Sequence, residues 1–268
     1  MKNKGSHSIA ELLACVVARE LKNDDSVAVG LNAELMLAAA YLSQKLYSPL
    51  LKIRHGLNAN KGVELNPASW TSNTRSKAHE FIDYVESHDS ILSIANQNNS
   101  NKICDTFFIS GLQIDKYGNT NLIGIKDKKN RNKKFKLRGP GSIGTTSIAQ
   151  FAKKYFIFSL EHSKRRFVEK VDYISSIGCN IRKKYRISGG PVLCITPLCV
   201  FDFENGGMRI KSMHSHSSLK EVLEKTCFKP IAPKNIPITK IPTGEELKIL
   251  RQIDNAGLLK NIEKEIVF

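Results

Sequence analysis

Ser26-Val27-Ala28-Val29-Gly30 is a short apolar segment that ends in glycine, and the sequence around it decides the fold. Residues 34–45 are rich in alanine and leucine, which predicts a helix, and residues 50–53 predict a second strand. A strand, a helix and a strand in this order are typical of a βαβ crossover in a parallel sheet. The sequence therefore predicts the α/β fold class.

Three further segments are almost continuously apolar, as is usual for strands that are covered on both faces of a sheet. They are residues 105–111, 155–160 and 191–196. Residues 199–210 predict a hairpin, because Asn205-Gly206 is a strong turn signal between two apolar runs. The remaining expectations are a helix that begins after Ser8 with Glu11 at capping-box spacing, a loop over 58–76, a helix over 77–85 and a helix capped by Ser218.

Residues 229–268 differ in pattern from the rest of the chain. Four prolines between residues 230 and 242 predict an extended segment, and apolar residues at helical spacing predict one helix over 245–264. We therefore expect one α/β domain over residues 1–228, followed by a proline-punctuated arm and a terminal helix over 229–268.

The composition is that of a globular protein. Hydrophobic residues make up 41% of the 268 residues and charged residues 25%, which excludes the disordered and collagen-like classes. No apolar run approaches the roughly 20 residues of a membrane span, and the first ten residues lack the apolar core of a secretory signal. The six cysteines are scattered, so we expect free thiols and a cytoplasmic location.

The net charge of +16 comes entirely from the second half of the chain. Residues 1–125 hold 12 basic and 12 acidic side chains, whereas residues 126–268 hold 29 and 13. The densest basic run is 126–138, with eight basic residues against Asp127 alone. Such a field attracts nucleic acid, anionic membranes or a phosphate-bearing ligand. For the run by itself, a solvated loop or a face that docks an acidic partner subunit is a better explanation than a specific nucleic-acid site, because Phe135 is its one aromatic residue.

Three polar segments are candidates for a site. Residues 139–146 form a glycine-rich loop whose backbone can approach a ligand, although an ordinary turn before a helix has the same pattern. Residues 111–121 place Gln, Asp and Asn after a strand, at the sheet edge where open α/β folds bind ligands, or in a simple turn. Residues 161–170 follow another strand, and there His162 is a base or a structural hydrogen-bonding group.

Together these segments are much more specific than any one of them. They resemble the β subunit of family I coenzyme A transferases, most closely the glutaconate CoA-transferase type, and the resemblance covers roughly residues 8–228. The matching residues are FISGLQIDKYGNTN at 108–121, GPGSIG at 139–144, HSKRRFVEKVDY at 162–173, GPV at 190–192 with Thr196, and MH at 213–214, VL at 222–223 and TCF at 226–228.

The resemblance implies an open three-layer α/β sheet of the NagB/RpiA/CoA-transferase-like type. It also implies an α subunit as obligate partner in a heterodimer or heterotetramer, and coenzyme A, as acyl-CoA, for a substrate together with a carboxylate. In such transferases a β-subunit glutamate attacks the thioester, and backbone amides of glycine turns steady the developing oxyanion. No metal is implied; His214 and His216 have no carboxylate or cysteine at ligand spacing.

The sequence departs from the family where the catalytic glutamate is expected, in a Glu-x-Gly motif just after the second strand. Arg54 stands there, followed by His55 and Gly56. A guanidinium stays protonated and cannot accept an acyl group. The nearest carboxylate, Glu64, is off the motif. The family also includes a two-subunit steroid-ring hydrolase whose β subunit lacks the glutamate; there the α subunit supplies it.

Two functions remain open at this stage. In the first, the chain is the β-like subunit of a CoA-transferase or acyl-CoA hydrolase that is active only with its α subunit. Arg54 then binds a substrate carboxylate, or neutralises an acidic patch of the partner. In the second, the fold is catalytically inactive and its basic surface binds an acidic protein or nucleic acid. A third explanation is a genome biased towards lysine and asparagine, which would enrich the chain in basic residues without any function. The predicted substrate-binding residues are Arg54, Gly56, Gln113, Asn119, Gly139, Gly141 and Gly144.

Overall fold

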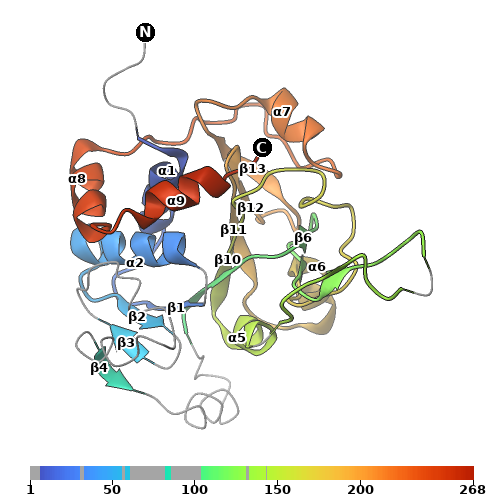
Figure 1. The fold of residues 1–268 in the computed structure, drawn as a ribbon, viewed down its shortest axis with the longest axis horizontal. Helices are drawn as coiled ribbons and strands as arrows, with labels where there is room; N and C mark the ends of the chain where they lie inside the picture. Colours follow the sequence, from blue (N-terminus) through green and yellow to red (C-terminus); the bar gives the residue numbers. More distant parts are fainter. Residues whose placement is uncertain are drawn as a thin grey trace. The chain divides into compact units, whose positions relative to one another are not determined.

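A computed structural model describes residues 7–30, 33–55, 58–60, 82–85, 104–130, 133–142 and 144–268; of residues 55, 58–60 and 82–85 it describes the backbone alone. Contacts divide the chain into two compact units (Figure 1). The first unit comprises Met1–Phe108 and Lys240–Ile266, and the second comprises Ile109–Thr239 and Val267–Phe268.

The first unit contains the predicted βαβ crossover. β1 (Ser26–Val29) leads through α2 (Glu34–Leu46) to β2 (Lys52–His55), and β1 pairs in parallel with β2. β1 also pairs in parallel with β5 (Thr106–Ile109), so β1 lies between the two other strands. These elements confirm the α/β class.

Three bounds in the first unit differ from the sequence-based expectation. β2 begins at Lys52 because Leu51 N–H donates to Ser48 O in a turn, so the strand includes Arg54 instead of ending before it. β3 (Asn58–Asn60) pairs antiparallel with β2, and β4 (Ile82–Val85) pairs antiparallel with β3. The predicted loop is therefore wrong at 58–60 and the predicted helix is wrong at 82–85; residues 61–81 lie outside the described residues.

Helix α1 (Ile9–Ala18) begins with the predicted capping box. Ser8 accepts from the backbone N–H of Glu11, and the Glu11 carboxylate accepts from the N–H of Ser8. Almost the whole helix is buried, as is α2, and the two helices pack against each other.

The C-terminal segment adds two helices to the first unit, where the sequence predicted one. α8 (Gly244–Ile253) ends before Asp254, and α9 (Leu258–Glu265) begins after Gly257, whose left-handed φ of +70° does not continue a helix. Both helices pack against α1 and α2. The carboxylate of Glu263 accepts the first N–H groups of α1, from Ile9 and Ala10, so α9 completes the cap of a helix more than 200 residues away in sequence.

A buried carboxylate anchors α8 to the N-terminal helices. Glu246, with 1% of its side chain exposed, accepts two hydrogen bonds from Arg19 at 2.6 and 2.7 Å and one from the Tyr47 hydroxyl. Burial raises the pKa of Glu246, but the hydrogen bonds from Arg19, the Thr243 N–H and Tyr47 outweigh it and lower that pKa to about 2. The carboxylate is thus charged in the fold and fully paired.

The second unit has a sheet in the order β13-β12-β11-β10. β10 (Lys154–Phe158) and β11 (Pro191–Ile195) are parallel, while β12 (Cys199–Asp202) and β13 (Arg209–Met213) continue the sheet antiparallel. The two predicted apolar strands and the predicted hairpin are confirmed, and Gly206 takes the left-handed turn position at φ +76°.

Shorter elements surround this sheet. The arm 229–239 runs along β13 through bridges at Ile231 and Ile238, and Val267 bridges Glu161. The smaller strands and helices are β6 (Gln113–Ile114), β7 (Thr120–Asn121), β8 (Gly124–Ile125), β9 (Leu137–Arg138), α5 (Thr145–Phe151), α6 (Cys179–Tyr185) and α7 (Leu219–Glu224). Ser218 caps α7 as predicted.

These contact units do not follow the predicted division at residue 228, which stays a prediction for the extent of the family domain. Among the described residues, no helix is long and apolar enough to cross a membrane.

Replacing Glu246 by Gln is expected to lower the free energy of unfolding by about 2 kcal/mol at pH 7, because Arg19 loses its charged partner. The folded-state pKa of Glu246 lies below its unfolded value, so its contribution is complete above about pH 5 and is lost as the pH falls towards 2. The difference between wild type and Glu246→Gln in urea unfolding should therefore shrink between pH 5 and pH 3. Glu245→Gln, an exposed neighbour, is the control; an equal loss there would contradict the assignment.

Candidate functional site

Asp115 and Asn119 shape the turn between β6 and β7. Asp115 accepts from the N–H groups of Tyr117 and Asn119 and from the Asn119 side-chain amide. Asn119 in turn accepts from Gly178 N–H at 2.7 Å. Burial raises the pKa of Asp115, against the lowering effect of these hydrogen bonds. The side chain of Asn119, predicted to bind substrate, is thus buried and bonded within the protein.

Gln113 has a similar position on β6. Its carbonyl oxygen accepts from Asn121 at 2.7 Å and from Asp172 N–H at 2.9 Å, and its amide donates to the Asp172 carboxylate at 3.1 Å. These bonds tie β6 to β7 and to the segment around Asp172. They give Gln113 and Asn119 a structural role, and a role of either in binding substrate stays a prediction.

The glycine-rich loop starts where β9 ends. Gly139 N–H donates to Ile123 O, and Gly141 N–H donates to Leu122 O. A Cβ atom at Gly139 would clash with the carbonyl oxygen of Leu122, whereas Gly141 needs glycine for its φ of +88°. Gly144 directly precedes the seven-residue α5. The predicted contact of this loop with a substrate stays a prediction, as does that of Gly56, which lies outside the described residues.

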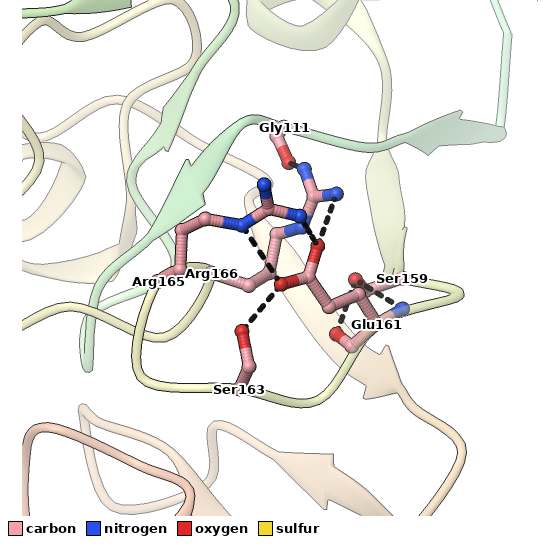
Figure 2. A network of polar contacts seen from close by, with 6 residues as sticks. All are labelled: Gly111, Ser159, Glu161, Ser163, Arg165 and Arg166. Atoms are coloured by element: carbon pink, nitrogen blue, oxygen red, sulfur yellow. Dashed lines mark hydrogen bonds and ion pairs between the residues drawn. The ribbon is translucent and has the colours of Figure 1, made fainter. Parts of the chain in front are cut away.

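A buried carboxylate follows β10 and organises the third candidate segment. Glu161 accepts from Ser163, from Arg165 and from Arg166, the last at 3.0 Å (Figure 2). Burial raises the pKa of Glu161, but the hydrogen bonds from Arg165 and Ser163 and the two guanidinium charges lower it to about 2. Glu161 is therefore charged and saturated with partners.

Arg166 connects this network to Gly111, two residues after the end of β5. One of its terminal nitrogens donates to Gly111 O, while the other contacts Glu161 (Figure 2). Arg166 is also the backbone partner of Ile114, so residues 166–168 pair with β6. The polar residues at 111–121 and those at 161–170, predicted as separate candidates, are thus brought together in one unit.

His162 is a structural residue. Its ring is fully buried, stacks on Phe167 at 4.6 Å and has Thr196 and Thr226 hydroxyls at its two nitrogens. Burial lowers the pKa of His162 to about 3. A neutral imidazole has one N–H, which donates to one of the two threonine hydroxyls. Each hydroxyl donates its own hydrogen to a backbone carbonyl, Thr196 to Cys199 O and Thr226 to Val222 O.

His214 and His216 are also held by protein atoms. His214 is buried between the Thr239 hydroxyl and Thr196 O, and His216 contacts Pro197 O at 2.9 Å. Within the described ranges, no three His, Cys, Asp or Glu side chains are grouped as a metal site would require.

Arg54 belongs to the first unit, whereas the residues described above belong to the second. It is half-buried on β2, level with Ala28 of β1 and Ala59 of β3. Burial raises the pKa of the Cys104 thiol to about 12, and the Arg54 charge acts in the opposite direction. A permanently charged guanidinium therefore stands near the carboxyl end of a parallel strand, the edge at which α/β folds bind ligands.

The model of the family described as coenzyme A transferase matches residues 10–225. The chain belongs to the coenzyme A transferase family. It is 27% identical to the B subunit of glutaconate CoA-transferase from Acidaminococcus fermentans, over 96% of this chain and 96% of that protein. It is 29% identical to the cholesterol ring-cleaving hydrolase IpdB subunit of Mycobacterium bovis, over 56% of this chain and 60% of that protein.

Solved structures agree with the family. The decarboxylase AibA/AibB superposes with a TM-score of 0.79 at 19% identity, over 96% of this chain and 99% of that one. At this identity the likeness concerns the fold alone. The predicted CoA-transferase-like α/β fold and the resemblance to both the transferase and the steroid-ring hydrolase subunits are confirmed.

Sequence reasoning missed the Glu161–Arg166–Gly111 connection and the threonines around His162. The first left a signal, because Glu161 follows an apolar strand directly and arginines stand four and five residues later. For the second, Thr196 and Thr226 stand among the matching residues, but no local pattern places them against His162, since Thr226 is 64 residues away in sequence.

Arg166→Lys is expected to lower the free energy of unfolding by about 2 kcal/mol, because lysine cannot span Gly111 O and Glu161 at once. Arg165→Lys is the matched control: Arg165 makes two bonds to the same carboxylate but is 71% exposed, so a change within about 0.5 kcal/mol is expected. Urea unfolding at pH 7 measures both. Equal losses would mean that burial does not decide the strength of this network.

Gly139→Ala is expected to lower the free energy of unfolding by about 2 kcal/mol, since the added methyl group meets backbone atoms of Leu122. Gly144→Ala should stay within about 0.5 kcal/mol, because its Cβ would make only an ordinary contact, at 3.5 Å from Ile148. Thermal unfolding of the two variants tests the predicted order; a reversed order would contradict the loop geometry.

Proposed function

We propose that this chain is the β-like subunit of a two-subunit enzyme that acts on an acyl-CoA thioester. The observation that carries the proposal is the family match over residues 10–225, together with a relative that aligns over 96% of both chains and is itself one subunit of a CoA-transferase. The second relative is likewise one subunit of a larger enzyme by name. We infer an α subunit as partner, in a heterodimer or heterotetramer.

Arg54 sets the chemistry that this chain contributes. In the proposal it occupies the family's glutamate position, where its guanidinium cannot attack a thioester but offers a planar fork to a carboxylate. The carboxylates nearest the polar segments, Glu161, Asp115 and Asp172, are each engaged by protein donors. The catalytic glutamate then comes from the α subunit, and Arg54 orients the carboxylate of the substrate.

The reaction is either CoA transfer or hydrolysis. In transfer, the catalytic carboxylate attacks the thioester carbonyl and forms an anhydride as the CoA thiolate leaves. The thiolate then attacks the enzyme carbonyl of the anhydride, which releases the donor acid and leaves an enzyme-bound CoA thioester. A second carboxylate finally receives the CoA through the same two steps in reverse. In hydrolysis, water takes the place of the accepting carboxylate. Relatives of both kinds match this chain, so the family does not choose between them. Gly139, Gly141 and Gly144 are proposed to contact the substrate through their backbone, and Gly56 is proposed separately as a substrate-binding residue.

The test uses the chain co-purified with an α subunit that carries its own glutamate, assayed on a panel of acyl-CoA thioesters. We expect turnover by the complex and by neither chain alone. Borohydride and hydroxylamine convert an enzyme-bound CoA thioester to an alcohol and to a hydroxamate, and mass spectrometry should find neither product on a carboxylate of this chain. Arg54→Gln should raise the KM of a carboxylate substrate about tenfold, with partial recovery in Arg54→Lys, which keeps the charge without the fork.

A trapped adduct on this chain would contradict the assignment of Arg54. Absence of turnover with every partner, combined with polyanion binding that falls steeply with salt, would favour the second function: an inactive module whose basic surface binds an acidic protein or nucleic acid. A cytoplasmic location is part of the proposal and rests on the scattered cysteines.

A further inference from the structure

The described part of the basic run predicted from the sequence forms a hairpin, defined here as residues 124–130 and 133–138. β8 and β9 pair antiparallel at its base, with Lys136 N–H donating to Ile125 O at 2.8 Å (Figure 1, green). Six lysines and Arg138 are exposed on its described part. Its one acidic residue, Asp127, uses a carboxylate oxygen to accept the backbone N–H groups of Lys129 and Asn130.

No described acidic side chain neutralises these seven cations. Within the described part of the chain, none of them forms an ion pair, whereas Arg209 on β13 pairs with both Asp202 and Glu204. A surface of this kind gains most from a ligand that brings several negative charges at once.

An aromatic pair lies beneath the cations at the base of the hairpin. Phe135 and Tyr173 have ring centroids 5.6 Å apart, and both rings are half-buried. Lys126 Nζ lies 5.0 Å from the Tyr173 ring, and Lys134 and Arg138 lie 5.5 and 5.2 Å from the Phe135 ring. Such rings offer a stacking surface for a base, and the surrounding cations offer partners for phosphates.

The hairpin is continuous with the glycine-rich loop. β9 ends at Arg138, and the next residue, Gly139, donates its N–H to Ile123 O beside β8. The aromatic pair and the loop therefore belong to one backbone structure. A ligand bound at the rings can extend along the loop without leaving the second unit.

We propose that this hairpin binds the 3′-phosphoadenosine 5′-diphosphate portion of the acyl-CoA substrate. The inference rests on the proposed function and adds to it the residues that recognise the nucleotide. The adenine packs on Tyr173 and Phe135, Lys126 and Lys134 contact the phosphates, and the pantetheine arm leads towards the glycine-rich loop. The 3′-phosphate distinguishes CoA from other adenine nucleotides, so it is the group that the surplus of cations selects.

Binding is measured by calorimetry on the full chain, alone and with its α subunit, at low salt with 3′-phosphoadenosine 5′-diphosphate and with ADP. We expect the first to bind about tenfold more tightly than ADP, as the loss of a charge-assisted contact implies. The double variant Lys126→Gln, Lys134→Gln should lose about tenfold in affinity and most of this preference. Tyr173→Leu should weaken both nucleotides alike, and Tyr173→Phe should not.

The matched control is Lys183→Gln with Lys184→Gln, which also removes two exposed charges, one of them over the Tyr185 ring at 5.2 Å. It should bind both nucleotides as wild type does. Equal losses in the control, no effect of the hairpin variants, or tight binding of a single-stranded oligonucleotide without binding of the mononucleotide would each overturn the inference. Because the readout is direct binding, its failure is distinct from an absence of acyl-CoA turnover, which bears on the proposed function.

Discussion

The ion pair between Glu161 and Arg166 is the interaction that holds two candidate segments of the second unit together, residues 111–121 and 161–170. A carboxylate that leaves water must be paired, and this one is paired by a guanidinium whose other nitrogen holds Gly111 O. The same arginine joins its backbone to Ile114. One buried ion pair thereby fixes the chain on both sides of β6, at Gly111 and at Ile114.

Much of the fold can be predicted from the sequence, because it depends on patterns of neighbouring residues. The βαβ crossover, the capping box at Ser8 and the hairpin at Gly206 each follow from residues close to one another. The predicted helix and strand bounds that were wrong depend on turns that the apolar pattern does not reveal. Residues 254–257 separate α8 from α9 within a continuous apolar pattern, and the turn at Ser48 delays β2 so that Arg54 falls inside it.

The site was harder to predict than the fold, because its polar residues look alike in sequence whether they bind a ligand or the protein itself. Gln113 and Asn119 have the residue types and the place of pocket groups. Their partners, Asp172 and Gly178, are each 59 residues away, and no local pattern reveals that these partners occupy them. Arg54, by contrast, could be judged from the sequence alone, because an arginine side chain cannot attack a thioester whatever its surroundings are.

The return of the C-terminal helices to the first unit limits how the protein can be shortened. A truncation after residue 228 would keep every family-matched residue yet remove Glu263 from the start of α1 and Glu246 from Arg19. The apolar faces of α1 and α2 that α8 and α9 cover would then meet water. Minimal expression versions of this protein must therefore retain the tail, even though the family pattern stops before it.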